Sequence, residues 1–469
     1  MQKILNQYIN EHFDQLVKDT QGFISINSVL DESNTTPGAP FGEGIRQALT
    51  YALNKADEMG FETKNIDGYA GYAQYGHEGD QVAILAHVDV VPAVGDWIVP
   101  PYSAEIIDNK LYGRGSVDDK GPAMACLYAL KAIKDCKLPI KNHARIILGT
   151  DEETLARGIY YYLDREKAPD YGFSPDAEFP IIHAEKGTIR FMYHLPESDS
   201  DIVELHAGTR LNVVPDLAVA KIKGISPKEV LACADKLQLK AKINAHATEG
   251  QTTIEVHGVS SHACYPENGI NAIQNLLLLL KSLYPVHDTP LKQSLFRLTD
   301  LLKDETNGAS LGIACNDEVS GDLSFNTAII EVSAKEKKGD VNNRNVIKFD
   351  LRYPVTHNGE KLLSTLEKAG DSIGIKYELI QHKPPLYVEK DRPFIKELQK
   401  AYKECTGGEP KCISIGGGTY CRYVKNTVSF GPVFPGQIEL AHQNNEFIAL
   451  DDLKEITKIY AQAIYNLIG

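Results

Sequence analysis

Acidic residues and histidines occur at several places where the chain is expected to end a strand or form a glycine-rich loop. Asp118 and Asp119 lie between glycines in the stretch Gly113–Pro122, which reads Gly-Arg-Gly-Ser-Val-Asp-Asp-Lys-Gly-Pro. Two carboxylates this close repel each other unless a cation lies beside them. The stretch also fits an ordinary solvated turn, so it indicates a cation site only in combination with other residues.

Four further segments carry groups of the same kind, each at an expected strand end or in a turn. They contain His87 and Asp89, Glu152 and Glu153, Asp176, and His442. His87 and Asp89 directly follow an apolar run, and residues two apart on a strand point to the same side. Glu152 and Glu153 follow a second such run. Taken alone, each segment also fits a capped strand end or a solvated acidic turn.

The positions of the apolar residues predict the elements that must hold these groups. The apolar run 81–86 is typical of a strand that is buried on both faces, and segment 145–150 predicts a second buried strand. Apolar residues recur at helical spacing after Pro122 and in segments 4–17 and 45–59. Strands that alternate with helices predict an α/β domain with a mostly parallel sheet flanked by helices. In such sheets, ligands bind outside the carboxyl ends of the strands.

The pattern changes near residue 187, where acidic strand ends give way to regular strands and long helices. We interpret residues 187–384 as an inserted α+β lid domain. It would divide the catalytic domain into a first part, residues 1–186, and a second part, residues 385–469. We expect strands at 188–194, 218–222, 252–257 and 346–353, and helices at 269–283, 291–303 and 359–373.

Length and composition argue against several classes of protein. The chain has 469 residues, of which 43% are apolar and 24% charged, and such a length predicts about two or three domains. Its formal net charge of −14 argues against nucleic acid or an anionic membrane as a partner. We see no secretory leader, and the longest apolar burst, 276–280, is too short to span a bilayer. The eight cysteines form no Cys-x-x-Cys pair, so we expect reduced thiols and a cytoplasmic protein.

The scattered donors amount to two imidazoles and three carboxylates within one expected α/β domain. We predict that they bind two divalent metal ions through His87, Asp118, Glu153, Asp176 and His442. This mixture of nitrogen and oxygen donors suits zinc, manganese or cobalt better than calcium, and zinc is our first expectation. Asp118 shared by both ions would hold them about 3.5–4 Å apart, as in two-metal hydrolases. His87 and Asp176 would then bind one ion, and Glu153 and His442 the other.

The motifs, in this order, resemble the di-zinc metallopeptidase family of carboxypeptidase G, acetylornithine deacetylase and carnosinase. The resemblance rests on His87-x-Asp89, Gly113-Arg-Gly with Asp118-Asp-Lys-Gly121, Asp151-Glu-Glu153, Asp176 and His442. Within that family, the stretches Phe173–Phe179, Glu185–Gly187 and Gly416–Tyr420 are most similar to the bacterial peptidase V dipeptidases. The similarity extends over essentially the whole chain, and it implies a zinc-peptidase-like catalytic domain.

The resemblance also implies roles for residues around the metal ions. Glu152 would be the general base, which takes a proton from a water bridging the two ions and passes it to the leaving amine. Asp89 would fix the orientation of His87. The family has a cis peptide after the shared acid, which in this chain is the Asp118–Asp119 bond.

Other implied roles concern the substrate. His262 in the lid domain would stabilise the oxyanion of the tetrahedral intermediate. Asn212 and Arg352 would both grip the substrate, and Arg352 is suited to meet a carboxylate through two parallel hydrogen bonds. A glycine-rich loop would add backbone N–H donors from Gly416, Gly417, Gly418 and Thr419.

These inferences favour a metal-dependent dipeptidase that cleaves unblocked dipeptides. One alternative is a deacylase or carboxypeptidase that acts on N-acyl amino acids with the same two-metal centre. Another is a catalytically inactive binding protein that the metal ions stabilise. The insert is long for the family and would let the lid serve its own active site, so we expect a monomer. The segment Gly95-Asp96-Trp97 is one residue shorter than the family pattern, and Trp97 fits either core packing or a pocket wall.

Overall fold

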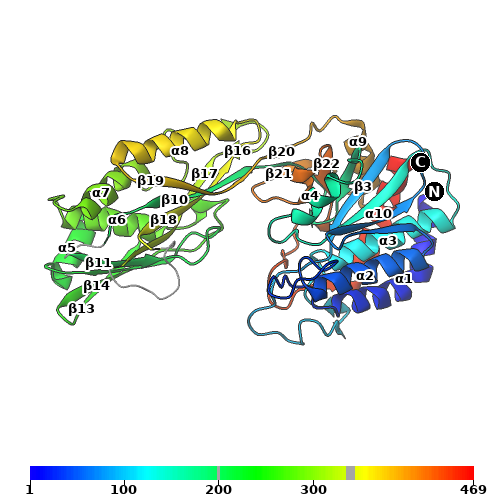
Figure 1. The fold of residues 1–469 in the computed structure, drawn as a ribbon, viewed down its shortest axis with the longest axis horizontal. Coiled ribbons are helices and arrows are strands. Elements are labelled where there is room, and N and C mark those ends of the chain that lie inside the picture. The colour runs from blue at the N-terminus through cyan, green and yellow to red at the C-terminus, as the bar shows by residue number, and fades with distance from the viewer. Residues whose placement is uncertain (198–200, 334–343) are drawn as a thin grey trace. The chain divides into compact units, whose positions relative to one another are not determined.

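The computed structural model of the protein describes residues 1–197, 201–333 and 344–469. The chain divides into two compact units (Figure 1). Unit 1 comprises Met1–Ala184 and Leu386–Gly469, so it contains both termini, and unit 2 comprises Glu185–Pro385. The domain boundaries expected from the sequence, after residues 186 and 384, lie close to the two points where the chain passes between the units. That unit 2 acts as a lid stays a prediction.

Unit 1 contains a nine-stranded sheet with a parallel centre. Its strands are β1 (Glu62–Ile66), β2 (Ala70–Tyr75), β3 (Gln81–His87), β6 (His143–Gly149), β7 (Tyr171–Ser174), β9 (Ile181–Glu185), β20 (Leu386–Tyr387), β21 (Cys412–Ile415) and β22 (Thr427–Ser429). The order is β1-β2-β6-β3-β7-β22-β9-β20, and β21 pairs with β9. Strands β6, β3, β7 and β22 are parallel to their neighbours in this series, whereas β2 is antiparallel to β1 and β6, and β9 to β22. The predicted mostly parallel sheet is confirmed, with antiparallel strands on both sides of its centre.

The helices of unit 1 cover this sheet. They are α1 (Gln2–Ile24), α2 (Glu43–Glu58), α3 (Lys120–Asp135), α4 (Arg157–Leu163), α9 (Pro393–Thr406) and α10 (Leu450–Ile468), with a short 3-10 helix, η3 (Tyr420–Tyr423). Every residue of β3 is buried, as the continuous apolar run predicts for a strand covered on both faces. Helix α3 is buried over most of its length because it packs against α1 and α10 as well as the sheet.

Unit 1 also contains two small sheets. One joins β4 (Ile106–Ile107), β5 (Lys110–Tyr112) and β24 (Phe447–Ala449), and the other joins β8 (Ala177–Glu178) and β23 (Pro432–Val433). Antiparallel pairing of β24 with β5 places Phe447 opposite Tyr112. This pairing brings the C-terminal segment that carries His442 next to the loop that carries Asp118.

Unit 2 is an antiparallel sheet with helices on one face (Figure 1). Its eight-stranded sheet has the order β13-β14-β12-β11-β17-β18-β10-β19. The strands are β10 (Gly187–His194), β11 (Ile202–Ala207), β12 (Leu217–Ile222), β13 (Lys242–Thr248), β14 (Gln251–His257), β17 (Ser324–Ser333), β18 (Val346–Tyr353) and β19 (Lys376–Lys383), with a two-residue pair, β15 (Asn316–Asp317) and β16 (Gly321–Asp322). The helices are α5 (Pro227–Leu237), α6 (Ala272–Leu283), α7 (Pro290–Leu302) and α8 (Gly359–Ile373), with a 3-10 turn, η1 (Pro266–Asn268). Alternate strand residues such as Ile189, Phe191 and Tyr193 form the core with these helices, which is the predicted α+β architecture.

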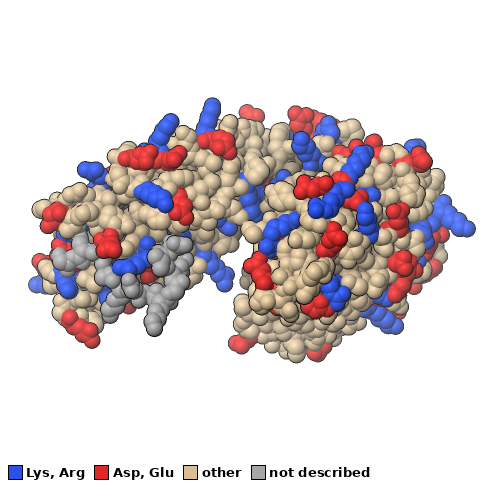
Figure 2. Space-filling view, in the orientation of Figure 1, with Lys and Arg blue, Asp and Glu red and all other residues tan. Residues whose placement is uncertain are grey.

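The surface and the helix composition bear on partners. On the face shown in Figure 2, acidic and basic side chains are interspersed on both units. Among the described residues, no helix combines the length and the apolar character that crossing a bilayer requires. The eight cysteines, all within the described residues, are thiols rather than disulfides.

Candidate metal centre

The predicted metal ligands of unit 1 meet at the carboxyl ends of neighbouring parallel strands. His87 ends β3, Glu152 and Glu153 follow β6, and Asp176 follows β7. Since these three strands are neighbours and run in the same direction, their ends lie at one edge of the sheet. The loop before α3 and the segment before β24 add Asp118 and His442 to the same place.

Asp118 occupies the centre of this cluster. Its Oδ1 lies 2.9 Å from Nε2 of His87, and its Oδ2 lies 3.1 Å from Nε2 of His442. Glu153 Oε2 lies 3.0 Å from the same His442 nitrogen, and Asp176 Oδ2 lies 3.6 Å from the His87 nitrogen. Each oxygen of the Asp118 carboxylate therefore faces a different histidine, and each histidine faces one further carboxylate.

The donor set fits bound cations. Two groups have ligand atoms within 4.8 Å of one another: His87 with Glu152 and Asp176, and His87 with Asp118 and Glu153. The buried Oε1 of Glu153 has no hydrogen-bond partner among the described residues, although buried carboxylate oxygens are almost always paired. A cation would satisfy this oxygen and offset the repulsion among the carboxylates.

In the metal-free cluster, the pKa values of several side chains are raised. Burial and the neighbouring Asp118 raise the pKa of Glu153 to about 7. Burial also raises the pKa of Glu152 well above its usual range, with Asp176 and Glu153 adding to the effect. Hydrogen bonds to Asp118 and Glu153 raise the pKa of His442 to about 11. Without metal ions, protons therefore supply the positive charge that the carboxylates need.

This charge distribution predicts that metal binding releases protons. At pH 7 the metal-free His442 is protonated and Glu153 is partly protonated, whereas both must lose their protons to bind a metal ion. We expect at least about one proton to be released when Zn²⁺ binds to the cluster. We also expect metal affinity to rise with pH. Calorimetric titrations at pH 7 in two buffers of different ionisation enthalpy measure this release. Equal heats in the two buffers would contradict the protonated state of the metal-free cluster.

Asp89 contacts both sides of the cluster. Its backbone carbonyl lies 3.0 Å from Nδ1 of His87, and its carboxylate Oδ1 lies 3.5 Å from the same nitrogen. The carboxylate also accepts the backbone N–H groups of Glu152 at 3.2 Å and Glu153 at 3.1 Å. Asp89 thus has the contact to His87 that an orienting role requires, and it also holds the backbone of the two acidic residues.

Asp119 and Lys120, the two residues after Asp118, fix the position of the loop. The Asp118–Asp119 peptide bond is cis, as the family resemblance implied. Asp119 Oδ2 accepts the backbone N–H of His87 at 3.1 Å, a contact that sequence analysis missed. Lys120 is fully buried, its ammonium donates to the Ile26 carbonyl at 2.6 Å, and burial lowers its pKa to about 7. Both side chains therefore fix the loop by contacts with segments that are distant in the sequence.

Three residues predicted to contact the substrate lie in unit 2. The backbone brings Asn212 and His262 together, because Val213 forms a bridge with His262 and the Ala263 N–H donates to the Asn212 carbonyl at 2.9 Å. Burial, with Arg352 nearby, lowers the pKa of His262. The neutral imidazole is therefore favoured, and its Nδ1 accepts the Cys264 N–H at 3.2 Å.

Arg352 is engaged within unit 2. Its Nε and Nη2 lie 2.6 Å and 3.1 Å from the two carboxylate oxygens of Asp350, and Nη1 donates to the Thr188 hydroxyl at 3.1 Å. The two parallel hydrogen bonds that we expected for a substrate carboxylate are made here with Asp350. The guanidinium is consequently held in one orientation by its own domain.

The glycine-rich loop lies in unit 1 between β21 and η3. Thr419 caps η3 by accepting the Cys421 N–H at 3.2 Å, and its hydroxyl lies 3.0 Å from that of Ser429. Arg422 Nη2 donates to the Gly417 carbonyl at 2.9 Å, and its guanidinium packs against Gly418 so closely that a Cβ there would clash. These contacts fix the shape of the loop, while substrate binding by Gly416, Gly417, Gly418 and Thr419 stays a prediction.

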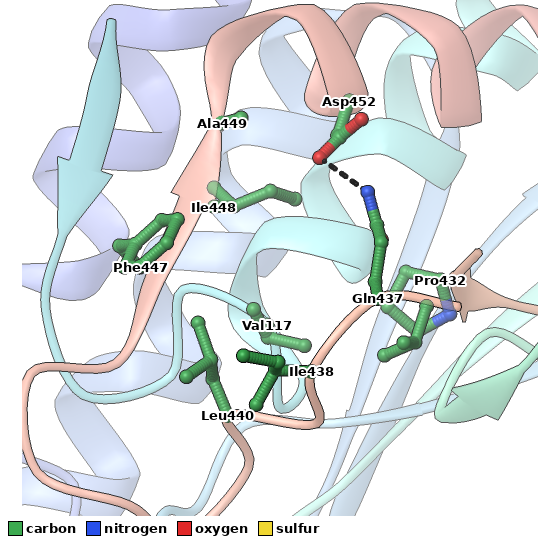
Figure 3. Close-up of a pocket in the computed structure, with 10 residues that line it drawn as sticks. Val117, Pro432, Gln437, Ile438, Leu440, Phe447, Ile448, Ala449 and Asp452 are labelled. Atoms are coloured by element: carbon green, nitrogen blue, oxygen red, sulfur yellow. Dashed lines mark hydrogen bonds between the residues drawn. The ribbon is translucent and has the colours of Figure 1, made fainter. Parts of the chain in front are cut away.

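An apolar pocket of about 260 Å³ lies beside the segments that carry Asp118 and His442 (Figure 3). It is lined by Val117, Pro432, Val433, Gln437, Ile438, Leu440, Phe447, Ile448, Ala449 and Asp452. Gln437 Nε2 donates to Asp452 Oδ2 at 3.0 Å along one wall. The loop before α3 therefore presents Val117 to an apolar pocket and the next residue, Asp118, to the charged cluster.

Comparison with known proteins places the chain in a group of peptidases. A profile of Peptidase family M20/M25/M40 matches residues 83–466. A Bacillus subtilis (strain 168) protein named "Putative dipeptidase YtjP" is 42% identical over 465 residues, which cover 97% of each chain. A Staphylococcus epidermidis protein named "Putative dipeptidase" is 34% identical over 473 residues, covering 97% of this chain and 98% of the relative.

Solved structures share the fold. Human carnosine dipeptidase 1 superposes with a TM-score of 0.60 at 17% identity, covering 99% of this chain and 98% of that one. The di-peptidase Dug1p from Saccharomyces cerevisiae superposes with a TM-score of 0.61 at 15% identity and the same coverage. At such low sequence identity, these two superpositions show a shared fold and nothing more.

Proposed function

The chain belongs to Peptidase family M20/M25/M40, and from that membership we propose that it is a metal-dependent dipeptidase that hydrolyses unblocked dipeptides. The observation that carries the proposal is the position of Asp118, whose two oxygens face His87 and His442 at 2.9 Å and 3.1 Å. A carboxylate in this position is suited to bridge two divalent ions. The similarity to two proteins named as dipeptidases directs the proposal to short peptides.

We propose that two ions bind as the donor types suggest. His87 and Asp176 would hold one, Glu153 and His442 the other, and Asp118 both. The mixed nitrogen and oxygen donors favour Zn²⁺, with Mn²⁺ or Co²⁺ as alternatives. When bound, the ions would polarise the scissile carbonyl and supply a water that loses its proton near neutral pH.

Residues of the chain would transfer the proton and hold the metal ligands in place. Glu152 would accept the proton of the attacking water and deliver it to the leaving amine. Bound cations would lower the pKa of Glu152 again, because positive charge stabilises its carboxylate. Asp89 would keep His87 and the Glu152 backbone in place through the contacts described above. The catalytic and orienting residues would thereby be fixed before substrate arrives.

We propose that unit 2, residues 187–384 in the division made from the sequence, acts as a lid. His262 would donate to the oxyanion, and Asn212 and Arg352 would contact the substrate. The support is that unit 2 holds Asn212 beside His262 and fixes Arg352 against Asp350. The proposal requires unit 2 to bring these groups to the substrate. A loop of Gly416, Gly417, Gly418 and Thr419 would add N–H donors to the substrate carboxylate.

Substrate choice distinguishes this proposal from its alternatives. We expect the zinc-, manganese- or cobalt-loaded protein to hydrolyse free dipeptides faster than the same dipeptides carrying an N-acetyl group. A panel of paired free and acetylated dipeptides, assayed by amine release, measures the ratio. Preference for the acetylated member would indicate a deacylase or carboxypeptidase. Metal binding without hydrolysis of either member would indicate an inactive binding protein.

Two further parts of the proposal concern the state of the protein in the cell. We propose a monomer, because the long insert would let each chain complete its own site, and a mass of two chains by light scattering would contradict this. We propose a cytoplasmic location and a role in peptide catabolism, which the thiol state of the eight cysteines supports. Fractionation that finds the protein outside the cytoplasm would contradict the location.

A further inference from the structure

Glu446 is a fully buried carboxylate that the proposed reaction does not use. It lies four residues after His442 and is 0% exposed. Its carboxylate accepts backbone N–H groups from Gly115 at 3.1 Å, Val117 at 2.8 Å and Asp118 at 3.2 Å. It also accepts Nη1 of Arg114 at 2.6 Å. Every one of these donors belongs to the loop that ends at the central aspartate of the cluster.

The backbone of this loop is shaped around the carboxylate. Gly115 has φ +90°, a conformation that side-chain-bearing residues rarely adopt. Successive N–H groups that converge in this way form a concave site for an anion. In many proteins such a site binds a ligand, whereas here Glu446 of the same chain fills it. The position of the Asp118 backbone is therefore set by a residue more than 300 positions away in the sequence.

The same residue also ties down the segment that carries His442. The Glu446 carbonyl accepts the Gly113 N–H at 2.9 Å, next to the pairing of β24 with β5. His442 and Asn445 have left-handed backbones, with φ of 65° and 60°. Residues other than glycine adopt this conformation less readily, so the contacts on either side help to hold the segment in it. Glu446 thus links the two segments that supply Asp118 and His442.

Arg114 and Trp97 complete the arrangement. Arg114 is 1% exposed, and its guanidinium lies 5.3 Å from the centre of the Trp97 ring. The Trp97 loop is joined to the C-terminal segment, because the Ile98 N–H donates to Asn445 Oδ1 at 2.6 Å. The tryptophan thus covers the Arg114–Glu446 ion pair, a role that the sequence did not indicate.

We infer that Glu446 is a positioning residue that holds Asp118 and His442 at the separation needed to bind two metal ions. The inference rests on the proposed two-metal function. Glu446 is too occupied by the loop to act as a ligand itself, since both its oxygens accept hydrogen bonds. Mutating a group that hydrogen-bonds to a metal ligand typically lowers metal affinity about 10–100-fold. We expect an effect of that size, although Glu446 contacts the backbone of Asp118 rather than a ligand side chain.

A purely structural ion pair would behave differently, and the variants are chosen to separate the two roles. Glu446→Gln alone leaves Arg114 buried without its carboxylate, so this variant can fail to fold. The double variant Arg114→Met/Glu446→Met removes both charges, and apolar replacement of a buried ion pair often preserves stability. Methionine offers no oxygen acceptor, so the N–H groups of Gly115, Val117 and Asp118, which all donate to Oε1 of Glu446, lose these hydrogen bonds. Glu166→Gln is the matched control, because it breaks the ion pair with Arg145 at the far end of β6.

The experiment titrates the metal-free full-length proteins with Co²⁺ and follows the visible absorption of the bound ion together with its stoichiometry. Wild type must bind two ions, and failure at this step overturns the proposed function rather than the role of Glu446. In the double variant we expect about 10–100-fold weaker binding of at least one ion and a changed absorption spectrum. The metal-free double variant and the control should show cooperative thermal unfolding, and the control should bind both ions like wild type.

Two results would overturn the inference. One is a folded double variant that binds both Co²⁺ ions with wild-type affinity and spectrum. The other is an equal loss of affinity in Glu166→Gln, because the effect would then follow from general destabilisation. If the double variant does not fold, Glu446→Asp decides in its place. It keeps a negative charge beside Arg114, but its shorter side chain cannot hold the N–H groups of Val117 and Asp118 as Glu446 does, so wild-type Co²⁺ affinity and spectrum in this variant would also overturn the inference.

Discussion

Replacing Glu152 with glutamine is expected to lower kcat for dipeptide hydrolysis by about 10²–10⁴-fold, the usual contribution of a general base. Glutamine has nearly the same shape, yet it cannot accept a proton. The backbone contact between Glu152 and the Asp89 carboxylate would remain, so the local structure should be preserved. Steady-state kinetics with a free dipeptide, on protein of measured metal content, gives the ratio.

The metal content separates a base from a ligand. Glu152 belongs to one of the two groups whose ligand atoms lie within 4.8 Å, so its loss must be shown to leave the ions bound. We expect two ions per chain in Glu152→Gln, as in wild type. Glu178→Gln is the matched control, since Glu178 is exposed and belongs to neither group. Wild-type kcat in Glu152→Gln would show that another residue is the base, and loss of an ion would show that Glu152 is a ligand.

Replacing Asp118 with asparagine should have the largest effect on metal binding. One of its oxygens lies 2.9 Å from His87 and the other 3.1 Å from His442, so both ions would lose a shared ligand. We expect the affinity for each ion to fall more than about 100-fold, because mutating a group that merely hydrogen-bonds to a ligand already lowers metal affinity about 10–100-fold. Hydrolysis should disappear with the ions. Calorimetric titration with Zn²⁺ measures both affinities.

Asp119→Asn provides the comparison for this variant. Asp119 is the adjacent buried carboxylate, but among the described residues its hydrogen bond to the cluster is with the His87 backbone N–H. We therefore expect a smaller loss, within about 10–100-fold. A loss confined to one ion in Asp118→Asn, or a greater loss in Asp119→Asn, would contradict the bridging position of Asp118.

Strand ends made most of the cluster predictable. Residues 82–86 before His87 and 146–148 in the strand before Glu153 are apolar because β3 and β6 are buried on both faces, and this signal needs no knowledge of distant contacts. Parallel neighbours then place their carboxyl ends together by geometry alone. Asp118 and His442 lie on loops, so no strand end marks their position, and they were predicted as ligands only because their donor types complete the set within the same expected domain.

Residues that act through the backbone were not predictable. Asp119 and Glu446 hold N–H groups of segments far away in the sequence, and no local pattern marks such contacts. The pairing of Arg352 with Asp350 is different, because residues two apart on a strand point to the same side and the signal was present. Strand β13 was missed because it lies at the edge of the unit 2 sheet, where its residues do not alternate regularly between buried and exposed.

Anomalous diffraction from crystals grown with Zn²⁺, recorded at the zinc absorption edge, tests the two-metal centre most directly. We predict two peaks about 3.5–4 Å apart, one on each side of the Asp118 carboxylate, with His87 beside one peak and His442 beside the other. A single peak, or two peaks that do not share Asp118, would contradict the proposed centre and the hydrolytic function derived from it.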